Sequence, residues 1–223
     1  MALCPPDRED AMALEAFIRT NTRLLSPPLV PEIKLYLAEE SVPIWQKTEE
    51  ELGEINVPPP YWAFAWAGGQ ALARYILDNP EFIQDKHVLD LGSGSGLTAI
   101  VALLAGAADV LACDIDAFAL AAARMNAREN KVVLSTTRDD LLAGSPLSYD
   151  VILVGDLFYE RTLAEKVLAF IEAAALGGAV VLIGDPQRNY FPRGRFTLAA
   201  EYLVPVTREL EDSLIKKTAV WRL

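Results

Sequence analysis

The chain is poor in the residues from which metal sites and disulfides are built. It has one histidine and two cysteines among 223 residues. His87 alone cannot form a histidine-based metal site, and Cys4 and Cys113 lie far apart in the sequence. We therefore expect no metal and no disulfide. Cys113 belongs to an apolar run and is predicted to be a small buried strand residue.

Long hydrophobic runs are also missing, although 52% of the residues are hydrophobic. No apolar stretch approaches the ~20 residues that a membrane-spanning helix needs. The opening residues, MALCPPDRED, match neither a secretory signal nor an arginine-rich transit peptide. These features predict a cytoplasmic protein whose apolar residues form a core.

Positive charge is in the minority. The chain has 20 lysines and arginines against 31 aspartates and glutamates, a formal net charge of −11 at pH 7. Nucleic-acid phosphates would be repelled, so a nucleic-acid partner is not expected. An acidic protein suits a substrate that presents a cation, such as a lysine side chain, although acidity is also typical of surfaces that only maintain solubility.

The N-terminal quarter differs in pattern from the rest. Residues 7–25 have helical spacing, and residues 32–40 alternate in the manner of a short strand. No internal repeat separates this quarter from the other three, so we predict one domain with an N-terminal helical cap. The expected buried stripe of the helix consists of Met12, Phe17, Ile18, Leu24 and Leu25.

Beyond residue 87, short apolar runs alternate with helical segments. The pattern predicts an α/β fold with a doubly wound, mostly parallel sheet covered on both faces. The last two runs suit an antiparallel hairpin that closes the sheet. The expected strands are 87–92, 109–114, 131–137, 150–156, 179–185, 202–210 and 214–223, and the expected helices are 68–78, 97–107, 117–130 and 160–176.

The strongest motif is VLDLGSGSGLTAI, residues 88–100. A strand runs into glycines and then at once into a helix, so the backbone can approach a ligand closely while helix amides face it. The motif departs from the dinucleotide pattern G-x-G-x-x-G because Leu97 stands at the third glycine position. The candidate cofactor-binding residues are Asp90, Gly92, Ser93, Gly94 and Gly96.

Acidic residues end the next two strands. Asp114 is expected to accept hydrogen bonds from a ribose, Ile115 to pack on an adenine, and Asp116 to cap the following helix. Asp139 or Asp140 follows the third strand, where a carboxylate can accept from the adenine amino group; a plain turn is the alternative. In doubly wound sheets, ligands bind beyond the carboxyl ends of the strands, where all of these residues fall.

The chain resembles the seven-β-strand S-adenosylmethionine-dependent methyltransferases. The features that carry this resemblance are LDLGSGSG, ACDID, a further strand that ends in an acid, and the closing hairpin. The resemblance runs from Pro58 to the C-terminus and divides the chain into an extension, 1–57, and a methyltransferase domain, 58–223. It implies that the glycine loop holds the methionine part of S-adenosyl-L-methionine and that Asp114 holds the ribose.

The sequence after the fourth strand narrows the resemblance. Asp156-Leu-Phe-Tyr159 is similar to the acid-x-x-Tyr element of a group of protein-lysine methyltransferases. With PPYWAFAWAGGQALARYILDNP and LIGDP, it resembles the family that methylates lysines of the electron transfer flavoprotein beta subunit, in a bacterial form. Methyl transfer to an amine is an in-line displacement that needs alignment. Asp156, facing the methyl group, is expected to bind and orient the amine, while Tyr159 holds Asp156 or walls the lysine channel.

The aromatic segment ahead of the glycine loop gains a role from this resemblance. Aromatic faces attract cations such as a sulfonium. Trp66 is therefore expected to lie over the cofactor, with Trp62 as a second candidate. Tyr61 and Phe64 are expected to be packing residues.

Some residues and alternatives stay open. Asp185 either touches the substrate or only shapes a turn before Pro186, and residues 188–195 form a basic loop that either contacts the substrate or is a solvated connection. His87 starts the first strand, opposite the site, and is expected to be structural. The alternative function is a methyltransferase of the same fold that acts on a ribosomal protein or a small-molecule amine. The glycine spacing disfavours a dehydrogenase, and a catalytically silent binding module is disfavoured by the Asp156–Tyr159 element.

Overall fold

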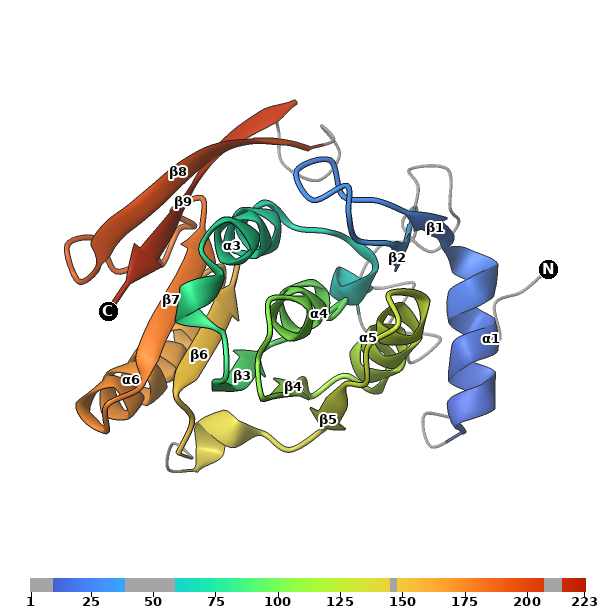
Figure 1. Ribbon diagram of the computed structural model, residues 1–223, viewed down its shortest axis with the longest axis horizontal. Helices are drawn as coiled ribbons and strands as arrows, with labels where there is room; N and C mark the ends of the chain where they lie inside the picture. Colours follow the sequence, from blue (N-terminus) through green and yellow to red (C-terminus); the bar gives the residue numbers. More distant parts are fainter. Residues whose placement is uncertain (1–9, 39–58, 145–147, 207–213) are drawn as a thin grey trace.

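The computed structural model describes residues 10–38, 59–144, 148–206 and 214–223. Its main feature is a seven-stranded sheet in the order β5-β4-β3-β6-β7-β9-β8 (Figure 1). The first five strands in this order are parallel, and β9 runs antiparallel to both β7 and β8. The predicted fold class, with its closing hairpin, is confirmed.

The strands of the main sheet are β3 (His87–Leu91), β4 (Asp109–Cys113), β5 (Ser135–Thr137), β6 (Val151–Gly155), β7 (Val180–Asp185), β8 (Thr197–Pro205) and β9 (Ile215–Arg222). The α-helices are α1 (Ala11–Asn21), α3 (Ala67–Asp78), α4 (Leu97–Leu104), α5 (Ala117–Glu129) and α6 (Arg161–Leu176). Three short 3-10 turns are η1 (Tyr61–Ala63), η2 (Pro80–Phe82) and η3 (Leu141–Ala143).

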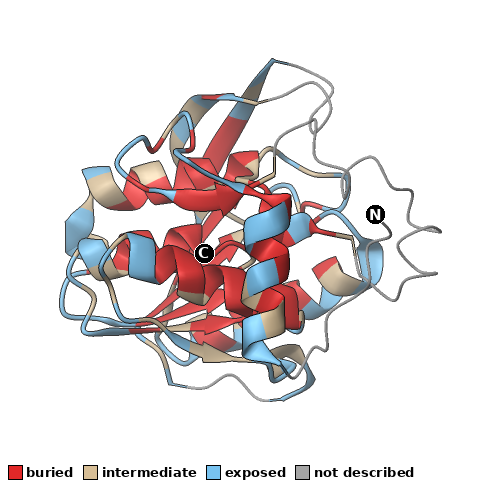
Figure 2. Ribbon diagram, turned by 90° about the vertical axis from the view of Figure 1, so that its right-hand side faces the viewer, coloured by how far each residue is buried: buried red, intermediate tan, exposed pale blue. Residues whose placement is uncertain are grey.

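Both faces of the sheet are buried, because side chains alternate between the two faces along each strand and helices cover each face. Val88, Val151 and Leu182 join the cluster formed with α3 and α4, whereas Leu89 and Ile152 join the cluster on the α6 side. Figure 2 shows the buried residues, in red, gathered in the strands and on the inner sides of the helices. This two-faced burial explains why the central strands read as nearly continuous apolar runs.

The strand order places a topological switch between β3 and β6. From β3 the chain proceeds outward through β4 to β5, and it then crosses back to β6 and proceeds the other way. The loops after β3 and β6 therefore leave the sheet in opposite directions and open a crevice at the carboxyl edge.

The N-terminal part packs against α5. β1 (Arg23–Leu25) pairs antiparallel with β2 (Leu35–Leu37), and the Tyr36 amide donates to Asn126 Oδ1 on α5 at 2.7 Å. The short strand is present, and the alternating residues Ile33, Leu35 and Leu37 are buried as expected, but Tyr36 between them is buried too. The strand lies between its partner and α5, and both of its faces are covered.

The expected helix over 7–25 is shorter than predicted. Within the described residues it ends at Asn21, where Thr22 turns extended and its hydroxyl donates to the Ile18 carbonyl at 2.6 Å. Leu24 and Leu25 therefore lie in a strand and are 40% and 37% exposed. Met12 is 83% exposed, so these three were wrongly placed in the buried stripe, while Phe17 and Ile18 are buried as expected.

The strand expected over 131–137 is also shorter, because only Ser135–Thr137 pair with β4. Lys131 has a positive φ of 61° in the turn after α5, and Val133 is 92% exposed. β5 is an edge strand with one neighbour, so the apolar residues just before it, such as Val133, are less covered than those of the central strands. None of the helices within the described ranges combines the length and the hydropathy that crossing a bilayer would require.

Candidate active site at the carboxyl ends of the strands

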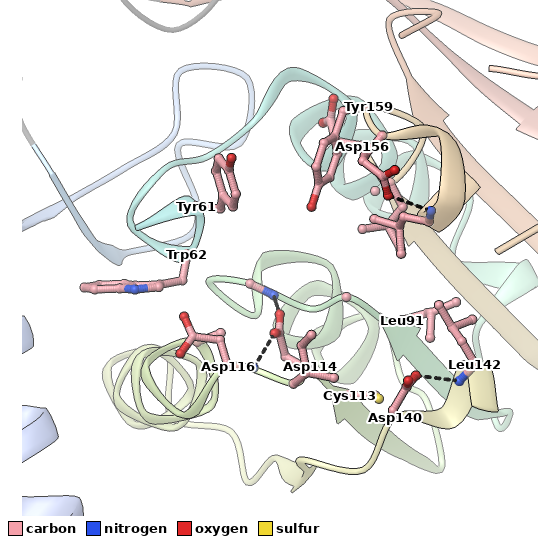
Figure 3. Close-up of a pocket in the computed structure, with 18 of the residues that line it drawn as sticks. Tyr61, Trp62, Leu91, Cys113, Asp114, Asp116, Asp140, Leu142, Asp156 and Tyr159 are labelled. Atoms are coloured by element: carbon pink, nitrogen blue, oxygen red, sulfur yellow. Dashed lines mark hydrogen bonds between the residues drawn. The ribbon is translucent and has the colours of Figure 1, made fainter. Parts of the chain in front are cut away.

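A cavity of about 650 Å³ lies over the switch point. Its walls come from η1, from the loops after β3, β4, β5 and β6, and from the start of α6 (Figure 3). Arg188, after β7, completes the lining. The sequence thus brings together, at one edge of the sheet, segments that are more than 100 residues apart.

The glycine loop after β3 forms the floor of the cavity. Gly92 and Gly94 line the cavity, and both have left-handed backbones with φ of 65° and 50°. A Cβ atom added to Gly92 would lie 2.7 Å from the Leu157 side chain. Gly96 lies away from the cavity, where an added Cβ would lie 2.8 Å from that of Ala123 on α5. Because residue 96 has no side chain, the loop and α5 can pack closely against each other. The buried Ser93 hydroxyl has no hydrogen-bond partner among the described residues.

Asp90 lies beneath the loop and does not line the cavity. Its carboxylate accepts hydrogen bonds from Thr98 Oγ1 at 2.7 Å and from the Ala99 amide at 3.1 Å. Complete burial raises the pKa of this carboxyl to about 7. These contacts tie the end of β3 to the first turn of α4, which gives Asp90 a supporting position under the glycine loop.

Asp114 directly follows β4 and does line the cavity. Its Oδ2 accepts from the Gly94 amide at 2.9 Å and its Oδ1 from the Asp116 amide at 3.0 Å (Figure 3). Burial raises the pKa of this carboxyl. An ionised carboxylate has about four acceptor positions, so these two bonds leave capacity for a ligand. Asp116 caps α5 by accepting from the Phe118 amide, as predicted, and Ile115 lies at the rim, 68% exposed.

Asp139 and Asp140 both reach the cavity from the loop after β5. Asp140 Oδ1 accepts from the Leu142 amide at 3.1 Å and caps η3, while Asp139 Oδ2 accepts from Thr137 Oγ1 at 2.7 Å. Cys113 is buried beside them, as predicted, and its thiol donates to the Asp139 carbonyl at 3.3 Å.

Asp156 lines the cavity wall directly after β6. Its φ of 57° is left-handed, a conformation that costs a non-glycine residue roughly 1–2 kcal/mol. Its amide donates to the Gly184 carbonyl at 3.0 Å, and its Oδ2 accepts from the Gly69 amide at 3.1 Å. The fold thus fixes both the backbone and the carboxylate of the residue expected to orient the amine.

Arg188 completes this part of the site, although sequence patterns alone do not pair it with Asp156. Its Nε and one terminal guanidinium nitrogen, Nη2, lie 2.9 and 2.7 Å from Asp156 Oδ1. Its amide donates to Asp185 Oδ1 at 2.7 Å. Asp185 is fully buried, and burial together with the nearby Asp156 charge raises the pKa of its carboxyl to about 7. The only signal in the sequence is the basic stretch 188–195 after the strand.

The aromatic segment forms another part of the cavity wall, and a Cβ atom added to Gly94 would lie 3.9 Å from the Trp62 Cα atom. Trp66 lines it, with its indole nitrogen donating to the Tyr61 carbonyl at 2.9 Å. Trp62 is buried and stacks on Phe118, with the ring centres 6.2 Å apart. Phe64 packs in the core as predicted.

Tyr61 was wrongly assigned to packing alone. It is 45% exposed, lines the cavity, and its ring centre lies 5.8 Å from that of Tyr159. Tyr159 is 46% exposed, and its pKa is raised by burial. The two tyrosines together form one wall. His87, in contrast, pairs with Asp109 at the amino ends of β3 and β4, away from the cavity.

Comparisons with known proteins identify the family of the chain. The family model of ribosomal protein L11 methyltransferases matches residues 70–175. The electron transfer flavoprotein beta subunit lysine methyltransferase of Danio rerio is 38% identical over 216 residues, which cover 94% of this chain and 83% of the relative. The protein of the same name from Homo sapiens is 34% identical over 215 residues, 93% of this chain and 81% of the relative.

The fold is shared with solved methyltransferases. The crystal structure of a candidate RNA methyltransferase from Pyrococcus horikoshii superposes with a TM-score of 0.53 at 18% identity, over 69% of this chain and 81% of the other. Together with the glycine loop and the strand order, these findings define an S-adenosylmethionine-dependent methyltransferase. The chain belongs to the electron transfer flavoprotein beta subunit lysine methyltransferase family.

Proposed function

We propose that this protein transfers methyl groups from S-adenosyl-L-methionine to lysine side chains of the electron transfer flavoprotein beta subunit. The names of the similar proteins from Danio rerio and Rattus norvegicus, 38% and 35% identical, support this substrate. The observation that carries the proposal is the Asp156 carboxylate, held on the cavity wall near Trp66 and the two tyrosines. A carboxylate beside aromatic rings suits an alkylammonium group.

The residues at the ends of β3 and β4 fit the cofactor. Gly92 and Gly94 leave the backbone uncovered at the cavity floor, and Asp114 retains acceptor capacity for ribose hydroxyls. Asp140 is our choice for the adenine amino group and Trp66 for the aromatic face that the cationic part of the cofactor requires. When bound, the cofactor supplies an electrophilic methyl group on a positively charged sulfur.

The remaining chemistry falls to the chain's own side chains. Asp156 accepts a hydrogen bond from the lysine nitrogen and directs its lone pair into the cavity. Tyr61 and Tyr159 wall the lysine channel and exclude water from the reacting nitrogen. Positioning of this kind is worth roughly 7–11 kcal/mol in well-oriented model reactions.

The proposal is tested by incubating the purified protein with labelled S-adenosylmethionine and purified electron transfer flavoprotein, followed by mass spectrometry of both subunits. We expect label on lysines of the beta subunit. Asp156→Asn keeps the size of the side chain but loses its charge, and it is expected to lower kcat by about 100-fold. Cofactor binding, measured by calorimetry, should persist in this variant. Unlabelled beta subunit would reject the substrate, and full activity of Asp156→Asn would reject the role of Asp156.

The match of residues 70–175 to the L11 methyltransferase model favours a second candidate substrate, a ribosomal protein. Purified ribosomal protein L11 therefore belongs in the same assay as a competing substrate. Label on L11 and none on the flavoprotein would favour this alternative. We propose a cytoplasmic location for the reaction, which fractionation of the source cells would check.

A further inference from the structure

Arg188 lies against the carboxylate on which the proposed function depends. Two guanidinium nitrogens contact Asp156 Oδ1 at 2.9 and 2.7 Å, and the arginine side chain is only 18% exposed. We propose that Arg188 is a positioning residue for methyl transfer, which fixes the Asp156 carboxylate and by its charge favours the neutral form of the incoming lysine amine. This inference rests on the proposed function and adds to it a residue that acts through Asp156.

Three separate contacts fix the position of Arg188. Besides the ion pair with Asp156, its backbone amide donates to Asp185 Oδ1 at 2.7 Å, and its guanidinium lies 5.6 Å from the ring centre of Trp66. The arginine thus joins the ends of β6 and β7 to the residue that precedes α3. A planar guanidinium can make two contacts and stack on a ring at the same time, whereas a lysine ammonium cannot reproduce this geometry.

The charge of Arg188 has a chemical consequence. The new carbon–nitrogen bond forms from the lone pair of the lysine amine while the sulfur–methyl bond of the cofactor breaks, and its electron pair leaves with the sulfur as the neutral thioether S-adenosylhomocysteine. Because only a neutral amine has this lone pair, the lysine ammonium must first release a proton to water. A carboxylate alone would oppose this release, because an opposite charge stabilises the charged form of the amine. A guanidinium on the same carboxylate offsets that attraction and lowers the pKa of the bound amine. Asp156 can then orient the nitrogen without holding it as an ammonium.

Other titratable groups contact the Arg188–Asp156 pair or line the same cavity. Asp185, at the end of β7, accepts from the Arg188 amide, while Tyr61 on η1 and Lys166 on α6 line the cavity. The remaining ones are Asp114 at the end of β4, Asp139 and Asp140 after β5, Asp116 before α5, and Tyr159 and Glu160 after β6. Among the described residues that line the cavity, Arg188 and Lys166 are the cationic side chains, and acidic groups outnumber them. Removing Arg188 should therefore leave the bound amine in clearly more negative surroundings.

The test is the pH dependence of kcat at saturating substrate and cofactor, because kcat reports the pKa of groups in the bound complex. In Arg188→Gln we expect the midpoint of the rising limb to move up by about one pH unit, with kcat correspondingly lower at neutral pH. KM for the protein substrate should not rise, because the freed carboxylate attracts the ammonium more strongly. Arg188→Lys keeps the charge, and its midpoint should stay close to that of the wild type even though kcat falls.

Two controls separate this role from general damage. Arg193→Gln removes the same charge from an exposed position in the same loop and should leave the midpoint unchanged. The second control is a substrate peptide that carries thialysine, whose amine is less basic than that of lysine. With this peptide, the difference in kcat between Arg188→Gln and the wild type at neutral pH should be smaller. Thermal melts and cofactor titrations of each variant verify the fold.

The outcomes are distinct from those that test the proposed function. If the wild type methylates no lysine, the proposed function fails. If the wild type is active and Arg188→Gln has the same midpoint in the pH dependence of kcat as the wild type, only the role of Arg188 is wrong. Arg188→Lys keeps the positive charge, so a midpoint that differs from that of the wild type would also contradict the proposed role of Arg188. This second test does not depend on whether Arg188→Gln folds.

Discussion

The Asp114 carboxylate connects two parts of the candidate cofactor site. It receives the amide of Gly94 from the glycine loop and the amide of Asp116 from the turn that begins α5. We therefore propose that the loop geometry and the ribose contact both depend on this side chain. At the scale of single residues, we expect cofactor binding to be most sensitive to substitution of Asp114.

We predict that Asp114→Ala weakens S-adenosylmethionine binding by more than about tenfold, because hydrogen bonds to a charged group contribute roughly 1.5–3 kcal/mol each. Isothermal titration calorimetry measures this directly. Asp109→Ala is the matched control, since Asp109 begins the same strand at the opposite end and is exposed. Equal affinities in the two variants would show that Asp114 does not hold the cofactor.

Site residues could be predicted from the sequence where they directly follow a strand, because the end of the strand determines their position. Asp114 and Asp156 each follow a parallel strand directly, so the strand pattern alone brings them to one edge. The partnership of Asp156 with Arg188 was not predictable, because 32 residues separate them and the loop after β7 has no regular pattern. Asp90 shows the reverse case, in which a motif residue lies below the site and supports it.

At the scale of elements, the two adjacent glycines of α3 have different surroundings. A Cβ on Gly68 would collide with the Gly184 carbonyl of β7 and lie 2.5 Å from Asp156 Oδ2. A Cβ on Gly69 would meet no atom within 4 Å. The helix therefore crosses the sheet at Gly68, and this crossing also places the Gly69 amide against Asp156.

Gly68→Ala is expected to lower the melting temperature and the methylation rate together, because neither the β7 backbone nor the held carboxylate can move away cheaply. Gly69→Ala should instead raise the free energy of unfolding by roughly 0.5–1 kcal/mol, the usual gain of alanine over glycine within a helix. Urea unfolding and activity assays on the pair give the comparison. Similar effects at both positions would contradict the close crossing.

Elements that have a continuous buried face were the ones that the sequence predicted well. The four central parallel strands and α6 agree with their expected ranges to within two residues at each end. β5 and the end of α1 were predicted too long, because apolar residues such as Val133 and Leu24 are exposed there. Apolar character indicates burial only where a neighbouring element covers the residue.

For the whole molecule, the N-terminal part supports the cavity. Phe17 on α1 packs on Phe118 of α5 with ring centres 5.2 Å apart, and Phe118 stacks on Trp62, which lines the cavity. A continuous row of rings thus leads from the first helix to the wall of the cavity. We therefore propose that the division of the chain near residue 57 marks a change of sequence pattern within a single folding unit.

This view predicts a coupled effect of Phe17→Ala. Removing a ring that is only 8% exposed should destabilise the protein by roughly 3–5 kcal/mol and, because the support of Trp62 is lost, also weaken cofactor binding. Unfolding should remain a single transition by calorimetry. Met12→Ala changes an exposed residue of the same helix and should alter neither quantity. A separate early transition in Phe17→Ala, with cofactor affinity unchanged, would show that the N-terminal part folds independently of the site.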